Sequence, residues 1–192
     1  MIIVAIVKHI KSRNANYSDA LNYLIFQHDE STGKMILDEF NRPLRRDELY
    51  VDGLNCNPDT FDVECYECNE HFKKNRNRSE IKSHHYIISY DPADAIECDL
   101  TGEKAQALSL ELAKKIFPGY QALIVTHTDG HNGSGNIHTH IVINSVRTEQ
   151  LPSQIKFARS IQLNGLFLYP YVKILLFQFS MLIFKFYDCL TY

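Results

Sequence analysis

Apolar and polar positions along the first 150 residues predict alternating strands and helices. Residues 2–8 are almost continuously apolar, which favours a buried strand. Ser18 can cap a short helix over residues 18–24. Residues 85–89 again favour a strand, which the Asp91–Pro92 pair ends.

The clearest helix covers about residues 101–117. Its apolar positions fall on one stripe, at Ala105, Leu108, Leu112 and Ile116. The Pro118–Gly119 pair directly after the stripe ends this helix.

Two further strands are expected at residues 122–128 and 137–146, joined by a loop at 130–136 that is rich in glycine and asparagine. A strand, a helix and a long hairpin in this order predict an α+β domain with helices on one face of a largely antiparallel sheet. Residues 29–82 are weakly patterned and predict no clear element.

The pattern changes at about residue 154, so we expect one domain over residues 1–153 and a hydrophobic tail over 154–192. Residues 166–184 carry a single charge, Lys173, and favour a hydrophobic helix. Three interpretations stay open: an aberrant tail in place of the domain's natural continuation, a membrane anchor, or a core helix.

Charge excludes a main domain that binds nucleic acid through bulk positive charge. The net charge is −3, but the tail carries +3 and the first 150 residues −6. A local basic stretch is the exception, at Lys73, Lys74, Arg76, Arg78 and Lys82. It either holds phosphates of a single strand, with Phe72 and Tyr86 stacking on bases, or is a solvated charged face.

Five cysteines argue against a secreted domain built on disulfides, because their number is odd and their spacing uneven. The apolar start also lacks the flanks of a signal peptide, so a reducing cytoplasm is expected. Cys65, Cys68 and His71 resemble half of a zinc site, but no second half lies nearby, and free thiols are favoured.

Three histidines form the most informative pattern. His138 and His140 share one face of their predicted strand, because strand side chains alternate. The glycine-rich hairpin brings His127 beside them from the neighbouring strand. Three imidazoles on a rigid sheet, with further positions open, predict a metal site. Nearby, Asp129 either orients a ligand histidine or caps the turn.

At these residues the sequence resembles the relaxase/mobilization nuclease family of HUH endonucleases. The resemblance covers about residues 1–150. It is carried by the segment Ala20–Leu24, by His127 and Asp129, and by the His138-Thr139-His140 element that Asn144 follows.

The resemblance implies a single-strand DNA transesterase that nicks a transfer origin of a mobile element. Tyr23 would be the nucleophile that forms a 5′-phosphotyrosine, and the three histidines would hold Mg²⁺ or Mn²⁺. Nitrogen donors alone would also suit Zn²⁺. The family further implies an auxiliary mobilization protein and a coupling ATPase as partners.

Three alternatives stay open beside this hypothesis. Tyr17 is a rival nucleophile, because it lies six residues before Tyr23. A histidine-bound zinc hydrolase would activate water in place of a tyrosine. The chain could also be a truncated, non-catalytic relaxase fragment that binds DNA, since relaxase domains extend well beyond the last histidine strand.

Overall fold

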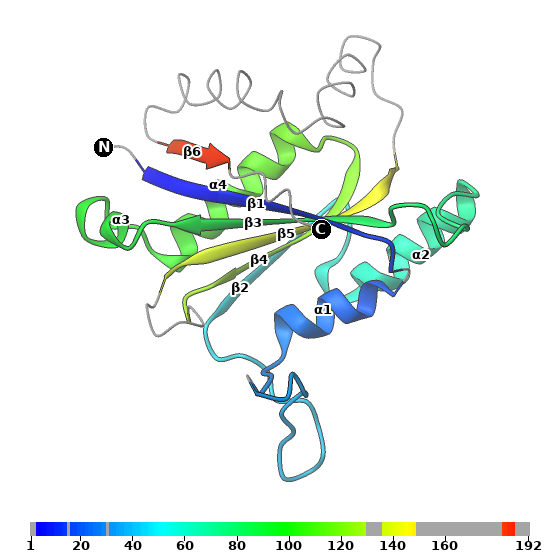
Figure 1. Ribbon diagram of the computed structural model, residues 1–192, viewed down its shortest axis with the longest axis horizontal. Coiled ribbons are helices and arrows are strands. Elements are labelled where there is room, and N and C mark those ends of the chain that lie inside the picture. Colours follow the sequence, from blue (N-terminus) through cyan, green and yellow to red (C-terminus); the bar gives the residue numbers. More distant parts are fainter. Residues whose placement is uncertain (1–2, 15, 30, 130–135, 149–181, 187–192) are drawn as a thin grey trace.

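A six-stranded sheet forms the centre of the computed structural model (Figure 1), which describes residues 3–14, 16–29, 31–129, 136–148 and 182–186. The strand order is β2-β4-β5-β3-β1-β6. Neighbours are antiparallel, except that β6 runs parallel to β1. The strands are β1 Ile3–Ser12, β2 Leu49–Leu54, β3 Ser83–Tyr90, β4 Tyr120–His127, β5 His138–Arg147 and β6 Leu182–Phe186.

Four α-helices and one short 3-10 turn complete the described elements. They are α1 Tyr17–Ile25, η1 Pro58–Thr60, α2 Phe61–His71, α3 Pro92–Glu97 and α4 Gly102–Ile116. The predicted cap of α1 was wrong. Asn16 caps the helix by accepting from the Ser18 backbone, whereas the Ser18 hydroxyl donates to Asp62. Thr101 caps α4 in the same way as Asn16 caps α1.

Helices cover both faces of the sheet, so the expectation of helices on one face was also wrong. Helix α4 packs against β2, β4 and β5 on one face, and α1 and α2 pack against β4 and β5 on the other. Figure 1 shows α1 and α2 side by side, away from α4. Along β5, Ile141 belongs to the first core and Val142 to the second.

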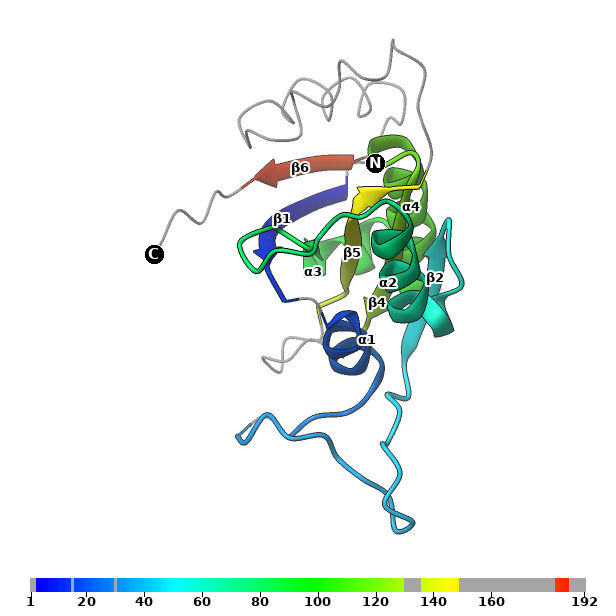
Figure 2. The ribbon, with the colours of Figure 1, turned by 90° about the vertical axis from the view of Figure 1, so that its right-hand side faces the viewer.

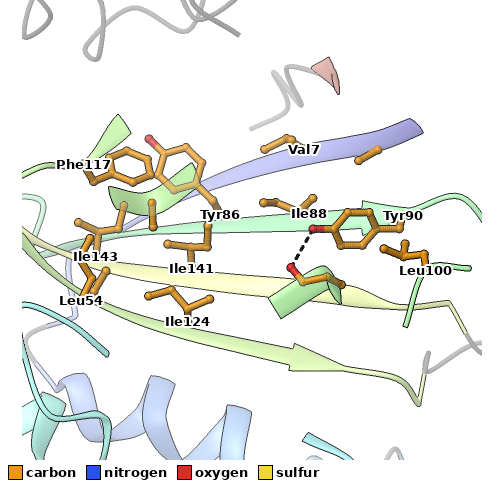
Figure 3. Packing of buried hydrophobic residues seen from close by; sticks show 14 of the residues in the cluster. Val7, Leu54, Tyr86, Ile88, Tyr90, Leu100, Phe117, Ile124, Ile141 and Ile143 are labelled. Atoms are coloured by element: carbon orange, nitrogen blue, oxygen red, sulfur yellow. Dashed lines mark hydrogen bonds between the residues drawn. The ribbon is translucent and has the colours of Figure 1, made fainter. Parts of the chain in front are cut away.

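The first core lies between the sheet and α4, where side chains such as Ile88, Ile124 and Phe117 pack together (Figure 3). Tyr90 is buried there, and its hydroxyl lies 2.9 Å from the Ser109 hydroxyl. The second core is built around Leu24 of α1, which has no exposed surface. That core fixes α1 against the strands that carry the histidines.

The segment of residues 29–82 holds more structure than its pattern predicts, namely β2, η1 and α2. Between α1 and β2 the chain leaves the sheet as a long arm (Figure 2). Isolated antiparallel β-bridges hold the two sides of this arm together, at Phe26–Arg45, His28–Met35 and Leu37–Pro43. The arm begins at the end of α1 and returns beside the same helix.

Little of the predicted hydrophobic helix can be compared with the structure. Residues 182–186 form strand β6 instead, and the rest of the segment at 166–184 lies outside the described residues. No helix in the described part of the chain has the length and apolar character needed to cross a membrane.

Candidate active site

The pairing of β4 with β5 brings the three predicted histidines together. His127 lies opposite His138, and His140 lies opposite Val125, two residues further along both strands. One ring nitrogen of each histidine lies within 4.8 Å of those of the other two. Within the described residues, no other group of three or more His, Cys, Asp or Glu side chains gathers in this way.

The outer nitrogens of two rings are held by backbone carbonyls. His127 Nε2 lies 2.8 Å from the Leu24 carbonyl, and His138 Nδ1 lies 3.1 Å from the Asn136 carbonyl. Because a carbonyl only accepts, each of these nitrogens carries the hydrogen. In the neutral rings, His127 Nδ1 and His138 Nε2 are then the nitrogens that carry the lone pairs.

Those two lone-pair nitrogens lie 3.3 Å apart. Two bonds of about 2.1 Å to one cation, meeting at 90–109°, place their nitrogens about 3.0–3.4 Å apart. The donor set and its spacing therefore fit a divalent cation held by nitrogen ligands.

The third ring, His140, is held by a side chain that the sequence did not single out. His140 Nδ1 lies 2.8 Å from Nε2 of His85 on β3. Tyr86 and Ile88 belong to the first core, so His85 projects from the opposite face, where His140 lies. The sequence could not reveal this pair, because it depends on the register between β3 and β5.

Burial keeps two rings of the cluster, His127 and His140, in the neutral form that binds metals. It lowers the pKa of His127 from 6.5 to about 4. The pKa of His140 is lowered further, first by burial and then by the neighbouring rings of His85 and His127. Both rings are therefore neutral at pH 7, as a metal ligand must be.

Asp129 forms an ion pair with Arg46, a residue that sequence reasoning missed. Arg46 Nη1 lies 2.8 Å from Asp129 Oδ2, and the arginine side chain is only 6% exposed. Among the residues that the structure describes, none forms a hydrogen bond with the buried Nε of Arg46. The positive charge of Arg46 also acts on His127 and His140, so the carboxylate offsets a cation beside the cluster.

The two candidate nucleophiles occupy opposite environments on α1. Tyr23 is 47% exposed and directly precedes Leu24, whose carbonyl contacts His127. Tyr17 is 5% exposed, and its hydroxyl lies 3.0 Å from Asn144 Oδ1. Burial raises the pKa of Tyr17 to about 12. Tyr23 is thus the accessible phenol of this helix.

A strip of β1 beside the cluster faces solvent. Ala5 and Val7 point into the first core, so Ile6, Lys8 and Ile10 lie on the histidine face, and all three are exposed. A substrate can therefore approach the histidines over β1 and β3.

Comparison with known proteins shows the family of the chain. The family described as relaxase, MobA/VirD2-like, nuclease domain matches residues 36–159, more than half of the chain. The chain belongs to this relaxase family. The three histidines and Asp129 lie inside the matched segment, and Tyr23 lies before it.

Curated relatives of this relaxase-family chain are similar over part of its length. Two of them, both called Protein rlx and from Staphylococcus aureus, are 35% and 37% identical over 101 residues. Each alignment covers 50% of this chain and 27% of the relative, so the chain matches only a minor part of the relatives' length. No solved structure gives a significant match.

The predicted basic stretch lies far from the histidines of this relaxase-family domain. It occupies the turn between α2 and β3, and β3 begins at Ser83, opposite Asn144. Asn144 lies four positions along β5 from His140 and six from His138, which corresponds to about 14–20 Å. Of the five basic residues, the four that we expected to bind DNA are exposed, Lys73, Lys74, Arg76 and Arg78.

Two details of the expected DNA surface were wrong. Lys82 is buried, and its amine contacts the Asn77 carbonyl. Tyr86 is also buried, between His9 and Phe117, so it cannot stack on bases. Phe72 is 42% exposed and stays a candidate.

The cysteines near α2 are free thiols. Cys65 and Cys68 are buried, and burial raises the pKa of both. His71 is exposed and packs against Phe72. The favoured interpretation of Cys65 and Cys68 as free thiols is confirmed.

Proposed function

We propose that this relaxase-family domain cuts single-stranded DNA at a transfer origin of a mobile element and stays attached to the 5′ end through Tyr23. The observation that carries the proposal is the convergence of His127, His138 and His140 next to the end of α1 that exposes Tyr23.

The reaction assigned to Tyr23 is a transesterification. Its phenol oxygen attacks the phosphorus, the bond from phosphorus to the 3′ oxygen breaks, and the phenolic proton is lost. The products are a 5′-phosphotyrosine and a 3′ hydroxyl that has gained a proton. A phenol with a pKa near 10 needs help to attack at pH 7.

The three histidines would hold Mg²⁺ or Mn²⁺, which polarises a non-bridging phosphate oxygen when bound. Their rings are fixed by the Leu24 carbonyl, the Asn136 carbonyl and His85. The Leu24 carbonyl follows Tyr23 directly in the chain, so this contact ties the end of α1 that carries Tyr23 to the cluster.

Asp129 and Arg46 would set the charge around the cluster. The carboxylate balances the buried guanidinium, so His127 faces a neutral pair instead of an isolated cation. This assignment gives Asp129 an electrostatic role, in place of the two roles that the sequence left open, orienting a ligand histidine or capping the turn. The auxiliary protein and the coupling ATPase stay predictions.

The test uses single-stranded oligonucleotides that tile the DNA flanking the protein's own gene, each with a fluorescent label at its 3′ end. With Mn²⁺, we expect the label to stay on the protein in denaturing gels. Chelator should abolish the adduct. Tyr23→Phe should also abolish it, and Tyr66→Phe should not, because Tyr66 is a phenol on α2 that is even more exposed than Tyr23, at 63%.

Each alternative predicts a different pattern in the same gels. A histidine-bound hydrolase would release the label as a free shorter oligonucleotide, and Tyr23→Phe would leave that product unchanged. A non-catalytic fragment would shift the DNA in native gels but would leave it uncut with every metal.

A further inference from the structure

The outer nitrogen of each cluster histidine is held by a different kind of group. Backbone carbonyls, of Leu24 and Asn136, hold His127 and His138. The third ring, His140, is held by the side chain of His85, at 2.8 Å. A carbonyl is an acceptor in every state, whereas an imidazole nitrogen can either donate or accept.

Only one direction of the hydrogen bond between His85 and His140 leaves His140 able to bind a cation. If His140 Nδ1 donates to His85 Nε2, the other nitrogen of His140 keeps its lone pair. If His85 Nε2 donates, the neutral His140 ring carries its hydrogen on Nε2 and offers no lone pair to the cluster. His85 must therefore accept, with its own hydrogen on Nδ1.

We infer that His85 is a positioning residue that fixes the orientation of His140 and the tautomer in which His140 Nε2 faces the cluster. This inference rests on the cation site of the proposed function. Outer partners of this kind commonly set the tautomer of a ligand histidine. Of the three outer partners, only His85 can be removed by a side-chain substitution, because the other two are backbone carbonyls.

The geometry also explains why His85 acts through His140 and is not a fourth ligand. His85 is not among the residues whose ligand atoms gather in the cluster, and its Nε2 is engaged by His140. Strand β3 fixes its place, because Ile87 lies opposite His140 and His85 lies opposite Val142. The ring therefore reaches His140 along the face of the sheet, behind the cluster.

The first test reads the tautomer in the metal-free protein. The full chain is labelled with ¹⁵N-histidine, kept in chelator, and compared with a His140→Gln sample to assign the His140 ring. We expect long-range ¹H–¹⁵N spectra at pH 7.5 to place the His140 hydrogen on Nδ1 and the His85 hydrogen on Nδ1. A His140 ring with its hydrogen on Nε2 would overturn the inference.

The second test measures Mn²⁺ affinity by calorimetry. We expect His85→Phe, which keeps a ring but removes the acceptor, to weaken binding about 10–100-fold. His85→Gln can place a carbonyl oxygen near the position of Nε2 and should stay within about threefold of the wild type. His84→Gln is the matched control, because His84 pairs with His9 instead of the cluster.

The outcomes separate this inference from the proposed function. Loss of binding in His127→Ala together with unchanged binding in His85→Phe would overturn the positioning role and leave the cation site intact. If the wild type binds no Mn²⁺, the proposed function fails, and the tautomer spectra still decide the inference. If His85→Phe does not fold, the Mn²⁺ affinities of His85→Gln and the shorter His85→Asn are compared instead. Equal affinities of these two variants would count against the inference.

Discussion

At the scale of single residues, the candidate site contains two buried histidine rings whose protonation is set by their surroundings. His127 and His140 are 1% and 5% exposed, and burial is the largest cause of their lowered pKa values. Burial keeps both rings neutral at pH 7, and for the same reason their protonation in acid lowers the free energy of unfolding.

Removing a ring from the cluster should remove the cation. We expect His127→Ala and His140→Ala each to weaken Mn²⁺ binding about 100-fold or more, above the loss typical of an outer partner. Calorimetry on the purified full chain measures this. His28→Ala serves as control, since this histidine contacts Tyr23 and the Phe26 carbonyl. Equal Mn²⁺ affinity in all these variants and the wild type would place the metal at another site.

Stability should fall in acid through the same rings. Unfolded His127 takes up a proton near pH 6.5, whereas the folded ring resists protonation to about pH 4. Its contribution is therefore complete above pH 6.5 and is lost as the pH falls toward 4. Between pH 7.5 and 4.5, this loss is about 2–3 kcal/mol from His127 alone.

Urea unfolding at a series of pH values, in chelator, measures that loss. The free energy of unfolding of His127→Gln should depend less steeply on pH than that of the wild type. Parallel curves for the two proteins would show that His127 is not protected from protonation.

The clustering of the three histidines was predictable from the sequence, and their outer partners were not. The alternation of a strand places His138 and His140 on one face, and the hairpin adds His127. The partners His85 and Arg46 lie 42 residues or more before these histidines in the chain. Only the assembled sheet and the arm bring them to the site.

At the scale of elements, helix α1 connects a buried polar network with an exposed phenol. The Tyr17 hydroxyl lies 2.8 Å from the Lys82 carbonyl and accepts from Asn69 at 2.9 Å. These contacts fix the first turn of α1, and the Leu24 side chain fixes its last turn. Tyr23 lies in that last turn, and its side chain is exposed to solvent.

The two tyrosines of α1 should therefore separate stability from chemistry. We expect Tyr17→Phe to lower the free energy of unfolding by about 1–3 kcal/mol, because it leaves buried polar partners unsatisfied. Tyr23→Phe should change it by less than about 0.5 kcal/mol. Urea unfolding measures both. Adduct formation should survive in Tyr17→Phe only, and the reverse pattern would make Tyr17 the nucleophile.

The exposed basic turn between α2 and β3 makes a separate prediction about DNA. Replacing Lys73, Lys74 and Arg78 with glutamine should reduce the salt dependence of single-strand binding, by about 0.7 in slope for each phosphate that is no longer neutralised. Fluorescence anisotropy across a salt series measures the slope. Lys114→Gln on α4 is the control, and an unchanged slope in the triple variant would make the turn a solvated face.

Element boundaries were predictable where the period was clear. Helix α4 and the hairpin strands appear within about two residues of their predicted limits. Strand β2 and helix α2 were missed, because their polar exposed positions hide the few buried residues, such as Phe61 and Cys65. Their burial depends on contact with β4 and α1.

At the scale of the whole molecule, the sheet is covered on both faces where the histidine strands run and exposed along β1. Four consecutive apolar residues of β4, from Ala122 to Val125, are fully buried, which is typical of a strand enclosed on both faces. In the sequence, this continuous apolar run indicates that both faces of the strand are covered, which disagrees with helices on one face only. The exposed strip on β1 leaves an approach to the histidines.

The central claim is that the exposed phenol of Tyr23, on the helix that contacts the histidine cluster, becomes covalently joined to DNA. Mass spectrometry of the adduct, after digestion with trypsin and nuclease, tests it most directly. The tryptic peptide of residues 14–34 contains both Tyr17 and Tyr23, so fragmentation of that peptide identifies the modified ring. We predict a nucleotide phosphate on Tyr23. A nucleotide on Tyr17 or on a tyrosine outside α1, or cleaved DNA with no protein adduct, would contradict the account.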